Sequence, residues 1–157
     1  MAKNKVTQED LDQFRKHSIG QSLMEVARHF QRHAIAGFAA EGYTQIQGSH
    51  QAILSHLNLS GTRLTDLAER AAITKQAMGQ LVDEVECLGF IERVQDPHDG
   101  RAKIVRFTAK GHALMKAGTR VGASVQQEYS ALIGEKKMQR LHDLLEELYE
   151  KLRKEQN

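Results

Sequence analysis

Two short runs in which apolar and polar residues alternate lie close together in the second half of the chain. They cover residues 90–95 and 103–108. A period of two is typical of half-buried β-strands. The segment between them, from Asp96 to Arg101, contains Asp, Pro and Gly, which favour turn geometry. The pattern therefore predicts a β-hairpin with Arg101 at its tip.

Upstream of the hairpin, two short helical segments are expected on either side of a tight turn. Thr65 is the expected N-cap of the first, which ends near Ala71, and Thr74 is the expected N-cap of the second. Apolar residues on the second helix recur at helical spacing and predict one buried stripe: Met78, Leu81, Val82, Val85 and Leu88. Gly89 is a suitable C-terminal stop. Helix, turn, helix and basic hairpin together predict a winged helix-turn-helix, an arrangement that holds double-stranded DNA.

Apolar residues at helical spacing also dominate the N-terminal part of the chain. They predict a long first helix from about Gln8 to about Phe38, with Gly20 as a place where it could be interrupted. A second helix is expected from Ser49 to Leu57, with Ser49 as its N-cap.

Downstream of the hairpin, Thr108 is expected to cap a long helix that Gly134 ends. The last segment carries apolar residues in alternating steps of three and four, the spacing of a coiled-coil seam: Met138, Leu141, Leu145, Leu148 and Leu152. A small monomer could not easily bury this seam together with the first helix, so we expect a dimer, with an intramolecular helical hairpin as the alternative.

Composition adds limits to this picture. The 157 residues suffice for one domain with a core and a dimerisation arm. No apolar run is long enough to span a bilayer, and no apolar signal core follows the basic residues 1–5, so a cytoplasmic protein without a membrane partner is expected. The net charge is only +2, and the segment 61–110 has eight Lys or Arg and eight Asp or Glu. Contact with DNA must therefore come from local placement of cations rather than from a basic domain.

The order and spacing of these pieces resemble the MarR family of bacterial transcriptional regulators, over nearly the whole chain. The segments that carry the resemblance are Arg63-Leu64-Thr65-Asp66-Leu67-Ala68, Ile73-Thr74-Lys75-Gln76-Ala77, Leu81-Val82, Leu88-Gly89-Phe90-Ile91-Glu92-Arg93, Asp96-Pro97-His98-Asp99-Gly100-Arg101 and Phe107-Thr108-Ala109-Lys110-Gly111. The chain departs from the family pattern at Ala102, where many members have an acidic residue, and at Phe107, where leucine is usual.

The resemblance implies a mostly α fold with a small β-hairpin wing. Residues 1–45 and 111–157 would form a helical dimerisation region, and residues 46–110 the winged helix-turn-helix. A homodimer would bind a pseudo-palindromic operator. Members of the family commonly repress transcription and release DNA when a small ligand or an oxidant acts.

The outer face of the second short helix is the first candidate DNA contact. An α-helix fits the major groove, where base edges carry a full hydrogen-bonding code. Gln76 and Gln80 lie one turn apart and are suited to bases, and Lys75 to a phosphate or a guanine. Thr74, at the start of the helix, is included in the predicted interface. The alternative is an ordinary solvated helix face.

The hairpin is the second candidate DNA contact. Arg101 suits the minor groove, where narrow A·T tracts concentrate negative potential. Asp99 is expected to pair with Arg101 and to fix its approach, as the Asp-x-Arg pattern of the family implies. Lys103 and Arg63 are candidate phosphate contacts, although a solvated cation is nearly as plausible for each.

A ligand pocket is expected between the dimerisation helices and the winged domain, where the family often binds aromatic acids. The candidate lining residues for a small aromatic or anionic ligand are Phe30, His33, Phe38, Tyr43, Ile46 and His50. His29 and His33 share a helix face and could hold a metal, but ordinary surface or packing roles are favoured for the histidines. Cys87 has no second cysteine beside it, so packing is favoured over redox sensing.

Other classes of function remain as alternatives. No catalytic triad, phosphate loop or metal signature is present, so no enzymatic activity, cofactor or metal site is predicted. The remaining alternatives are a DNA-binding dimer without small-molecule control, a metal-responsive regulator that uses the histidines, and a protein-binding adaptor with the same fold.

Overall fold

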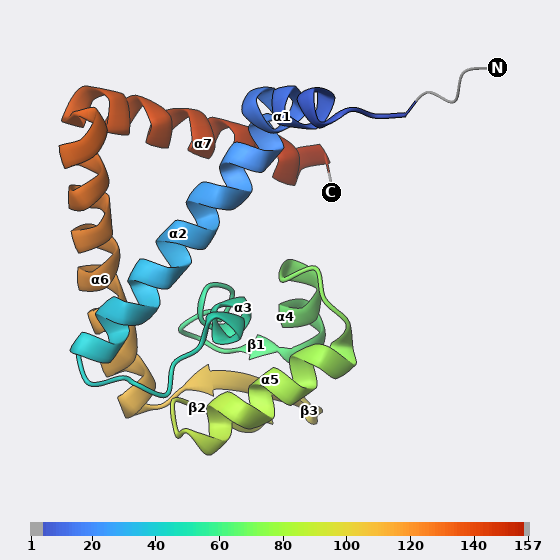
Figure 1. The fold of residues 1–157 in the computed structure, drawn as a ribbon. Helices are drawn as coiled ribbons and strands as arrows, with labels where there is room; N and C mark the ends of the chain where they lie inside the picture. The colour runs from blue at the N-terminus through green and yellow to red at the C-terminus, as the bar shows by residue number, and fades with distance from the viewer. Residues whose placement is uncertain (1–4, 156–157) are drawn as a thin grey trace.

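The computed structural model describes residues 5–155, most of which are helical (Figure 1). In chain order its elements are α1 Gln8–His17, α2 Ile19–Ala40, the 3₁₀ turn η1 Gly48–His50, α3 Gln51–Leu54, β1 Thr62–Arg63, α4 Leu64–Arg70, α5 Lys75–Cys87, β2 Ile91–Asp96, β3 Asp99–Phe107, α6 Ala109–Ile133 and α7 Glu135–Glu155. The predicted fold class, mostly α with a small β wing, is confirmed. The basic residues 1–4 lie outside the described part of the chain.

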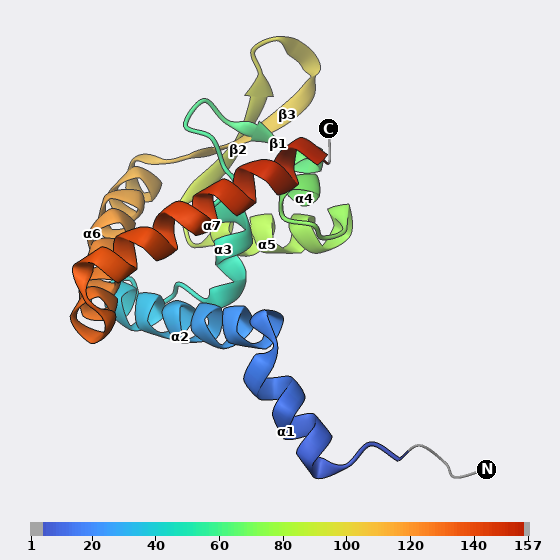
Figure 2. The ribbon, with the colours of Figure 1, turned by 90° about the horizontal axis from the view of Figure 1, so that it is seen from above.

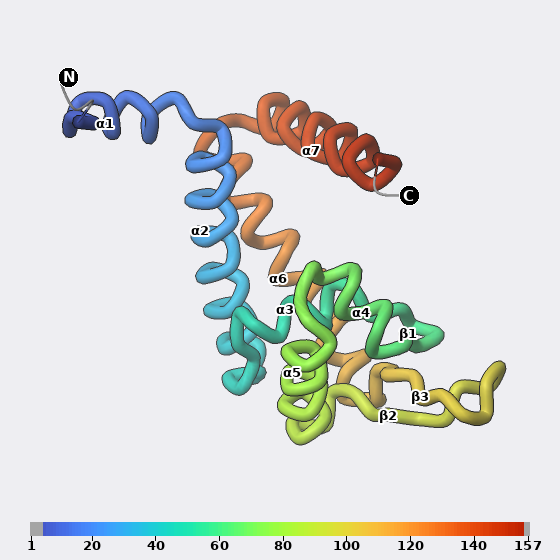
Figure 3. The backbone as a smooth tube through the Cα atoms, turned by 90° about the vertical axis from the view of Figure 1, so that its right-hand side faces the viewer, coloured from blue at the N-terminus to red at the C-terminus, as the bar shows by residue number. Residues whose placement is uncertain are grey.

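Two long helices, α2 and α6, pack against each other and connect the two ends of the molecule (Figure 1). They approach closely: a Cβ built on Gly37 would lie 2.7 Å from Val121 Cγ1. The winged helix-turn-helix lies at one end of this pair, and α1 and α7 diverge from the other end (Figure 3). None of the described helices is both long enough and apolar enough to cross a bilayer.

The core of the winged helix-turn-helix is built around α5. Met78, Val82 and Val85 are fully buried, as the predicted stripe requires, and Leu81 and Leu88 pack against the same core while partly buried. Gly89 follows the helix with φ +77°, a conformation that glycine adopts without steric cost, so its role as a stop is confirmed. The stripe fixes which face of α5 turns away from the protein.

The predicted hairpin exists, and its turn is tighter than expected. β2 and β3 pair down to Asp96 and Asp99, which leaves only two residues in the turn. Residues 100–102 lie between the pairs Asp96–Asp99 and Gln95–Lys103 and form a bulge on β3. Arg101 is therefore in the middle of this bulge rather than in the turn. The hairpin extends beyond the helices as a wing (Figure 2).

A third strand, β1, was not predicted. Thr62 pairs with Val105 and Arg63 with Ile104, so the sheet is antiparallel in the order β1-β3-β2. Two residues are too few to show an alternating pattern. Because the chain passes directly from β1 into α4, the N-cap of α4 is Arg63 and the prediction of Thr65 was wrong.

The long first helix was also predicted incorrectly. It is broken at Ser18, two residues before Gly20, into α1 and α2. Ser18 has extended dihedral angles, and its hydroxyl accepts a hydrogen bond from the Gln21 N–H at 3.2 Å. A serine in this geometry caps a new helix instead of continuing the old one.

The expected helix from Ser49 to Leu57 is shorter than predicted and begins differently. It consists of η1 and α3, which end at Leu54, and Ser49 does not cap it. The N-cap is Gln47, whose backbone N–H donates to Nδ1 of the buried His50 ring at 3.2 Å.

The two terminal helices contain no buried residue. Large apolar side chains along them are exposed by 39% or more: Leu11, Phe14, Leu141, Leu144, Leu145, Leu148, Tyr149 and Leu152. Four residues of the seam predicted on the last helix, Leu141, Leu145, Leu148 and Leu152, are therefore exposed, and the fifth, Met138, is partly covered.

A close backbone contact joins α6 to the sheet. A Cβ on Gly111, in the first turn of α6, would lie 2.0 Å from the Phe90 carbonyl oxygen. The same oxygen accepts the N–H of Thr108, the predicted and observed N-cap of α6. Only a residue without a side chain allows this approach.

We therefore expect Gly111→Ala to destabilise the protein by about 1–3 kcal/mol, since an added methyl group forces α6 away from the sheet. Gly122→Ala is the matched control, because Gly122 lies inside the same helix and its Cβ would have nothing within 4 Å. The control should be stabilised by about 0.5–1 kcal/mol. Urea unfolding of both variants measures this difference, and equal effects would contradict the packing argument.

Candidate nucleic-acid interface

The N-terminus of α5 is held by a turn that exposes its outer face. Thr74 caps the helix as predicted, and its hydroxyl accepts the Ala77 N–H at 3.1 Å. Before it, Ala72 has φ +52°, a left-handed conformation that is uncommon for a residue with a side chain. No feature of the sequence indicated this conformation at Ala72. The sharp turn that it makes sets the angle between α4 and α5.

The predicted base-reading side chains share the outer face of α5. Lys75, Gln76 and Gln80 are exposed. Gly79 lies between them, and a Cβ there would have nothing within 4 Å, so another molecule can approach the helix backbone closely. The structure thus brings together the residues that the sequence assigned to the major groove.

In the wing, one buried carboxylate organises the polar contacts. Asp96 is only 7% exposed, and its Oδ2 accepts hydrogen bonds from Arg63 Nε at 3.0 Å and Nη2 at 2.7 Å. Its Oδ1 accepts the His98 N–H at 2.9 Å. The His98 bond first, and then Arg63, hold the pKa of Asp96 below its ordinary value, while Asp96 raises the pKa of Arg63. Sequence analysis did not identify Asp96 as a site residue.

This arrangement changes the expected roles of Asp99 and Arg63. The Asp99 carboxylate contacts the side chain of Arg63 at 3.3 Å instead of that of Arg101. It still orients Arg101, because its Oδ1 accepts the Arg101 backbone N–H at 3.1 Å. Arg63 is engaged with two carboxylates, so its predicted contact with a phosphate would compete with these ion pairs.

The eight cations of segment 61–110 divide into two groups. Arg63, Arg93 and Arg106 pair with carboxylates, and Arg70 and Lys110 donate to backbone carbonyls. The other three are exposed, and their side chains form no bond to a residue that the structure describes: Lys75, Arg101 and Lys103. All three are among the residues predicted to contact DNA, which we call the DNA face: Arg63, Thr74, Lys75, Gln76, Gln80, Asp99, Arg101 and Lys103.

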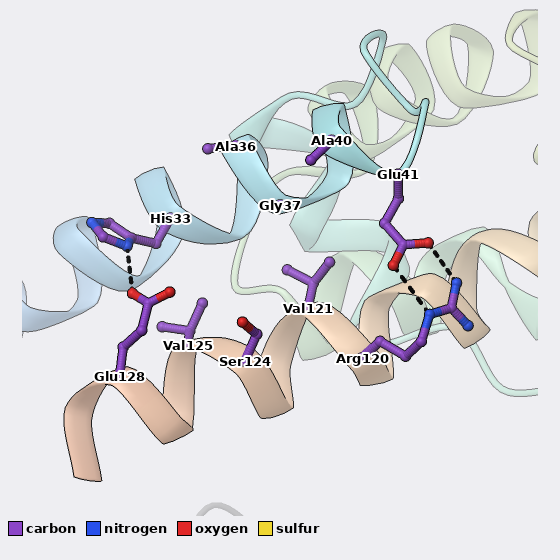
Figure 4. A pocket seen from close by; sticks show the side chains of 10 residues that line it. All are labelled: His33, Ala36, Gly37, Ala40, Glu41, Arg120, Val121, Ser124, Val125 and Glu128. Atoms are coloured by element: carbon purple, nitrogen blue, oxygen red, sulfur yellow. Dashed lines mark hydrogen bonds and ion pairs between the residues drawn. The ribbon is translucent and has the colours of Figure 1, made fainter. Parts of the chain in front are cut away.

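The predicted ligand residues do not form one pocket. Phe30, Phe38 and Ile46 line a cavity of about 320 Å³ between α2, the η1–α3 segment and α6, which we call the apolar cavity. His33 instead lines a groove of about 530 Å³ elsewhere between α2 and α6, which we call the polar groove (Figure 4).

Tyr43 and His50 belong to neither of these hollows. The Tyr43 ring packs on Phe90 with centroids 5.9 Å apart. His50 is 2% exposed, and its Nε2 lies 3.4 Å from Glu84 Oε2 on α5. Burial and these bonds give His50 a role inside the protein, where it connects the segment beside the apolar cavity to α5.

His29 and His33 share a face as predicted and stack at 4.2 Å. Their Nδ1 atoms lie 2.9 Å from the Tyr129 hydroxyl and 3.1 Å from Glu128 Oε2, and burial raises the pKa of Tyr129. Within residues 5–155 no three His, Cys, Asp or Glu side chains are arranged to hold a metal. Cys87 is exposed, so the packing role favoured for it was wrong.

Comparison with known proteins agrees with this geometry. Residues 44–102 match the model of the MarR family. Over 69 residues the chain is 32% identical to the transcriptional regulator HosA of Escherichia coli O111:H-, a match that covers 44% of this chain and 51% of HosA. The chain thus spans about half the length of the curated relatives it matches.

Two solved structures are similar in fold over most of the chain. CouR from Rhodococcus jostii RHA1 bound to p-coumaroyl-CoA is 20% identical, with a TM-score of 0.67, and the match covers 85% of this chain and 92% of that one. The transcriptional repressor CouR bound to a 23-mer DNA duplex is 19% identical, with a TM-score of 0.70 and coverage of 93% and 99%. Identities this low indicate a shared fold.

The ion pair in the wing predicts a pH dependence. The folded pKa of Asp96 is below its ordinary value of 3.8, so its contribution to stability is present above that value and is lost as pH falls through the folded pKa. We expect Asp96→Asn to melt below the wild type near neutral pH, and this difference to shrink at lower pH. Asp99→Asn is the control, because Asp99 is half-exposed and its carboxylate lies farther from Arg63 than that of Asp96. A difference that stays constant down to about pH 2 would contradict this role of Asp96.

Proposed function

We propose that this chain, whose winged-helix region belongs to the MarR family, is a sequence-specific DNA-binding transcriptional regulator. The observation that carries the proposal is the position of the three cations without a partner among residues 5–155. One lies at the start of α5 and two lie in the wing, where they can neutralise phosphates without breaking an ion pair of the protein.

The two parts of this face suit different grooves of DNA. The α5 helix fits the major groove, where Gln76 and Gln80 can form paired hydrogen bonds with adenine. The wing carries Arg101 on a bulge, at a reach that suits the narrow minor groove. The DNA duplex bound by the structurally similar CouR supports this assignment. Because CouR is a transcriptional repressor, the similarity also favours repression over activation for this chain.

We infer that the protein acts as a homodimer formed by residues 1–45 and 111–157. The apolar side chains of α1 and α7 support this, because each is exposed in the single chain and the energetic gain from covering them scales with the area removed from water. Two copies related by a dyad would present two α5 helices to successive major grooves of a pseudo-palindromic operator. Such a protein would work in the cytoplasm and would need no catalytic activity.

Ligand control is part of the proposal. The apolar cavity lies between the proposed dimerisation helices and the winged domain, so an occupant contacts both. The binding of p-coumaroyl-CoA by CouR supports a ligand-responsive regulator over a dimer without small-molecule control. The absence of a three-ligand metal cluster within residues 5–155 gives the metal-responsive alternative no support.

The proposal can be tested by selecting bound sequences from random DNA. We expect an inverted repeat whose half-site centres lie about 34–36 Å apart. Leu148→Asp places a charge in the α7 seam and should give monomers or insoluble protein that lose the repeat, as judged by sedimentation and by repeated selection. Glu147→Lys changes an exposed neighbour that pairs only with Lys151 and is the control. Selected sites without a dyad, or no selection at all, would overturn the proposal.

The wing should matter for binding and little for stability. Arg101 has no bonded side-chain partner among residues 5–155, so Arg101→Ala should change the free energy of unfolding by less than about 0.5 kcal/mol. It should weaken operator binding about tenfold or more. The slope of log affinity against log salt concentration should fall by the amount expected for about one phosphate contact. Arg106→Ala, on the same strand but paired with Glu92, is the control and should bind like the wild type. Binding titrations at several salt concentrations and parallel melts measure both effects.

A further inference from the structure

The apolar cavity and the polar groove differ sharply in charge. The polar groove is lined by the Glu41–Arg120 ion pair and by the contact between His33 Nδ1 and the Glu128 carboxylate (Figure 4). The lining of the apolar cavity contains no Lys, Arg, His, Asp or Glu. The two hollows therefore suit ligands of different chemistry.

The polar groups of the apolar cavity are all uncharged. They are the side chains of Gln31, Gln47, Gln51, Ser55 and Thr119. The Gln31 amide is already engaged, because its Nε2 donates to the Gly48 carbonyl at 3.1 Å and to Gln51 Oε1 at 3.4 Å. The rest of the wall is mainly aromatic and aliphatic, from Phe30, Phe38 and Ile46 among others.

The cations next to lining residues in the sequence do not compensate for this lack of charge, because none of Arg32, Lys116 and Arg120 is among the lining residues. Arg120 directly follows Thr119, but its side chain lines the polar groove (Figure 4). Its Nε and Nη2 atoms donate to the Glu41 carboxylate at 3.1 and 2.6 Å. Rotating it toward the apolar cavity would leave Glu41 without this partner.

A carboxylate that enters the apolar cavity would lose its hydration and gain no cation in return, which is unfavourable. An uncharged molecule loses far less hydration free energy when it enters the same cavity. We propose that the apolar cavity binds uncharged, largely apolar molecules and discriminates against carboxylates of the same shape. This inference rests on the proposed ligand-responsive function and narrows the expected aromatic or anionic ligand to the uncharged class.

The first test compares two probes with the same naphthalene ring, 2-naphthol and 2-naphthoate. Near neutral pH the phenol is uncharged and the carboxylate is ionised. The chain has no tryptophan, so the fluorescence of the probes can be followed directly. We expect 2-naphthol to bind at least about tenfold more tightly. Equal or tighter binding of 2-naphthoate, or no saturable binding of 2-naphthol, would overturn the proposal.

A cavity-filling variant tests where the probe binds. Gly122 lines the apolar cavity, and a Cβ there would meet nothing within 4 Å, so Gly122→Leu fills space without a clash at the backbone. It should lose 2-naphthol binding while Ala123→Leu, at the exposed neighbouring position, keeps it. Retained binding in a folded Gly122→Leu protein would overturn the assignment.

A third measurement tests charge directly and does not depend on filling the cavity. Thr119 lies at the exposed rim, so Thr119→Arg adds a cation there, and Thr119→Gln adds an uncharged side chain as the control. The arginine variant should bind 2-naphthoate several-fold more tightly than the glutamine variant. Equal affinities would overturn the role of charge. Selection of DNA by the ligand-free wild type is independent of all three tests, so failure of the proposed function is distinguishable.

Discussion

The carboxylate of Asp96 sets the geometry on which the proposed DNA face depends. It joins three parts of the chain: β1 through Arg63, the wing turn through the His98 N–H, and β2, to which it belongs. Arg63 is also the N-cap position of α4, the first helix of the helix-turn-helix. A burial of this depth is unfavourable for a charge unless its partners are well placed, and here two donor groups meet it. These bonds fix the position of the wing relative to the helices, in addition to the pairing of β2 with β3.

A second constraint acts on the opposite end of the molecule. The winged helix-turn-helix buries its apolar stripe within one chain, whereas α1 and α7 leave theirs in water. Covering exposed apolar side chains lowers the free energy, so these helices favour contact with another apolar surface. Opposite charges on α7 pair at short spacing in Lys151–Glu147 and Arg153–Glu150. The two ends therefore differ: the winged helix-turn-helix buries its apolar stripe within one chain, whereas α1 and α7 contain no buried residue.

Much of this was predictable from the sequence because it follows from local periodicity. The α5 stripe, its Thr74 cap and the end of α6 at Gly134 depend on residues within a few turns of one another. The break at Ser18 was missed because the same serine is compatible with a continuous helix. Strand β1 and the bond between Asp96 and Arg63 were missed because they depend on residues more than thirty positions apart. The predicted ligand residues of α2 are divided between the apolar cavity and the polar groove, because spacing along α2 does not determine which segment packs against each of its faces.

The near-neutral charge of segment 61–110 at first argues against DNA binding, and the structure explains why it does not. The net charge of a segment counts paired and unpaired cations alike. Only an unpaired cation can bind a phosphate without breaking an ion pair of the protein. Five of the eight acidic residues of this segment pair with its arginines: Asp96 and Asp99 with Arg63, Asp83 and Glu86 with Arg93, and Glu92 with Arg106. The exposed cations whose side chains form no bond within residues 5–155 are Lys75 on α5 and Arg101 and Lys103 in the wing. A neutral domain arranged in this way favours binding in one orientation over non-specific attraction, which is what a sequence-specific regulator requires.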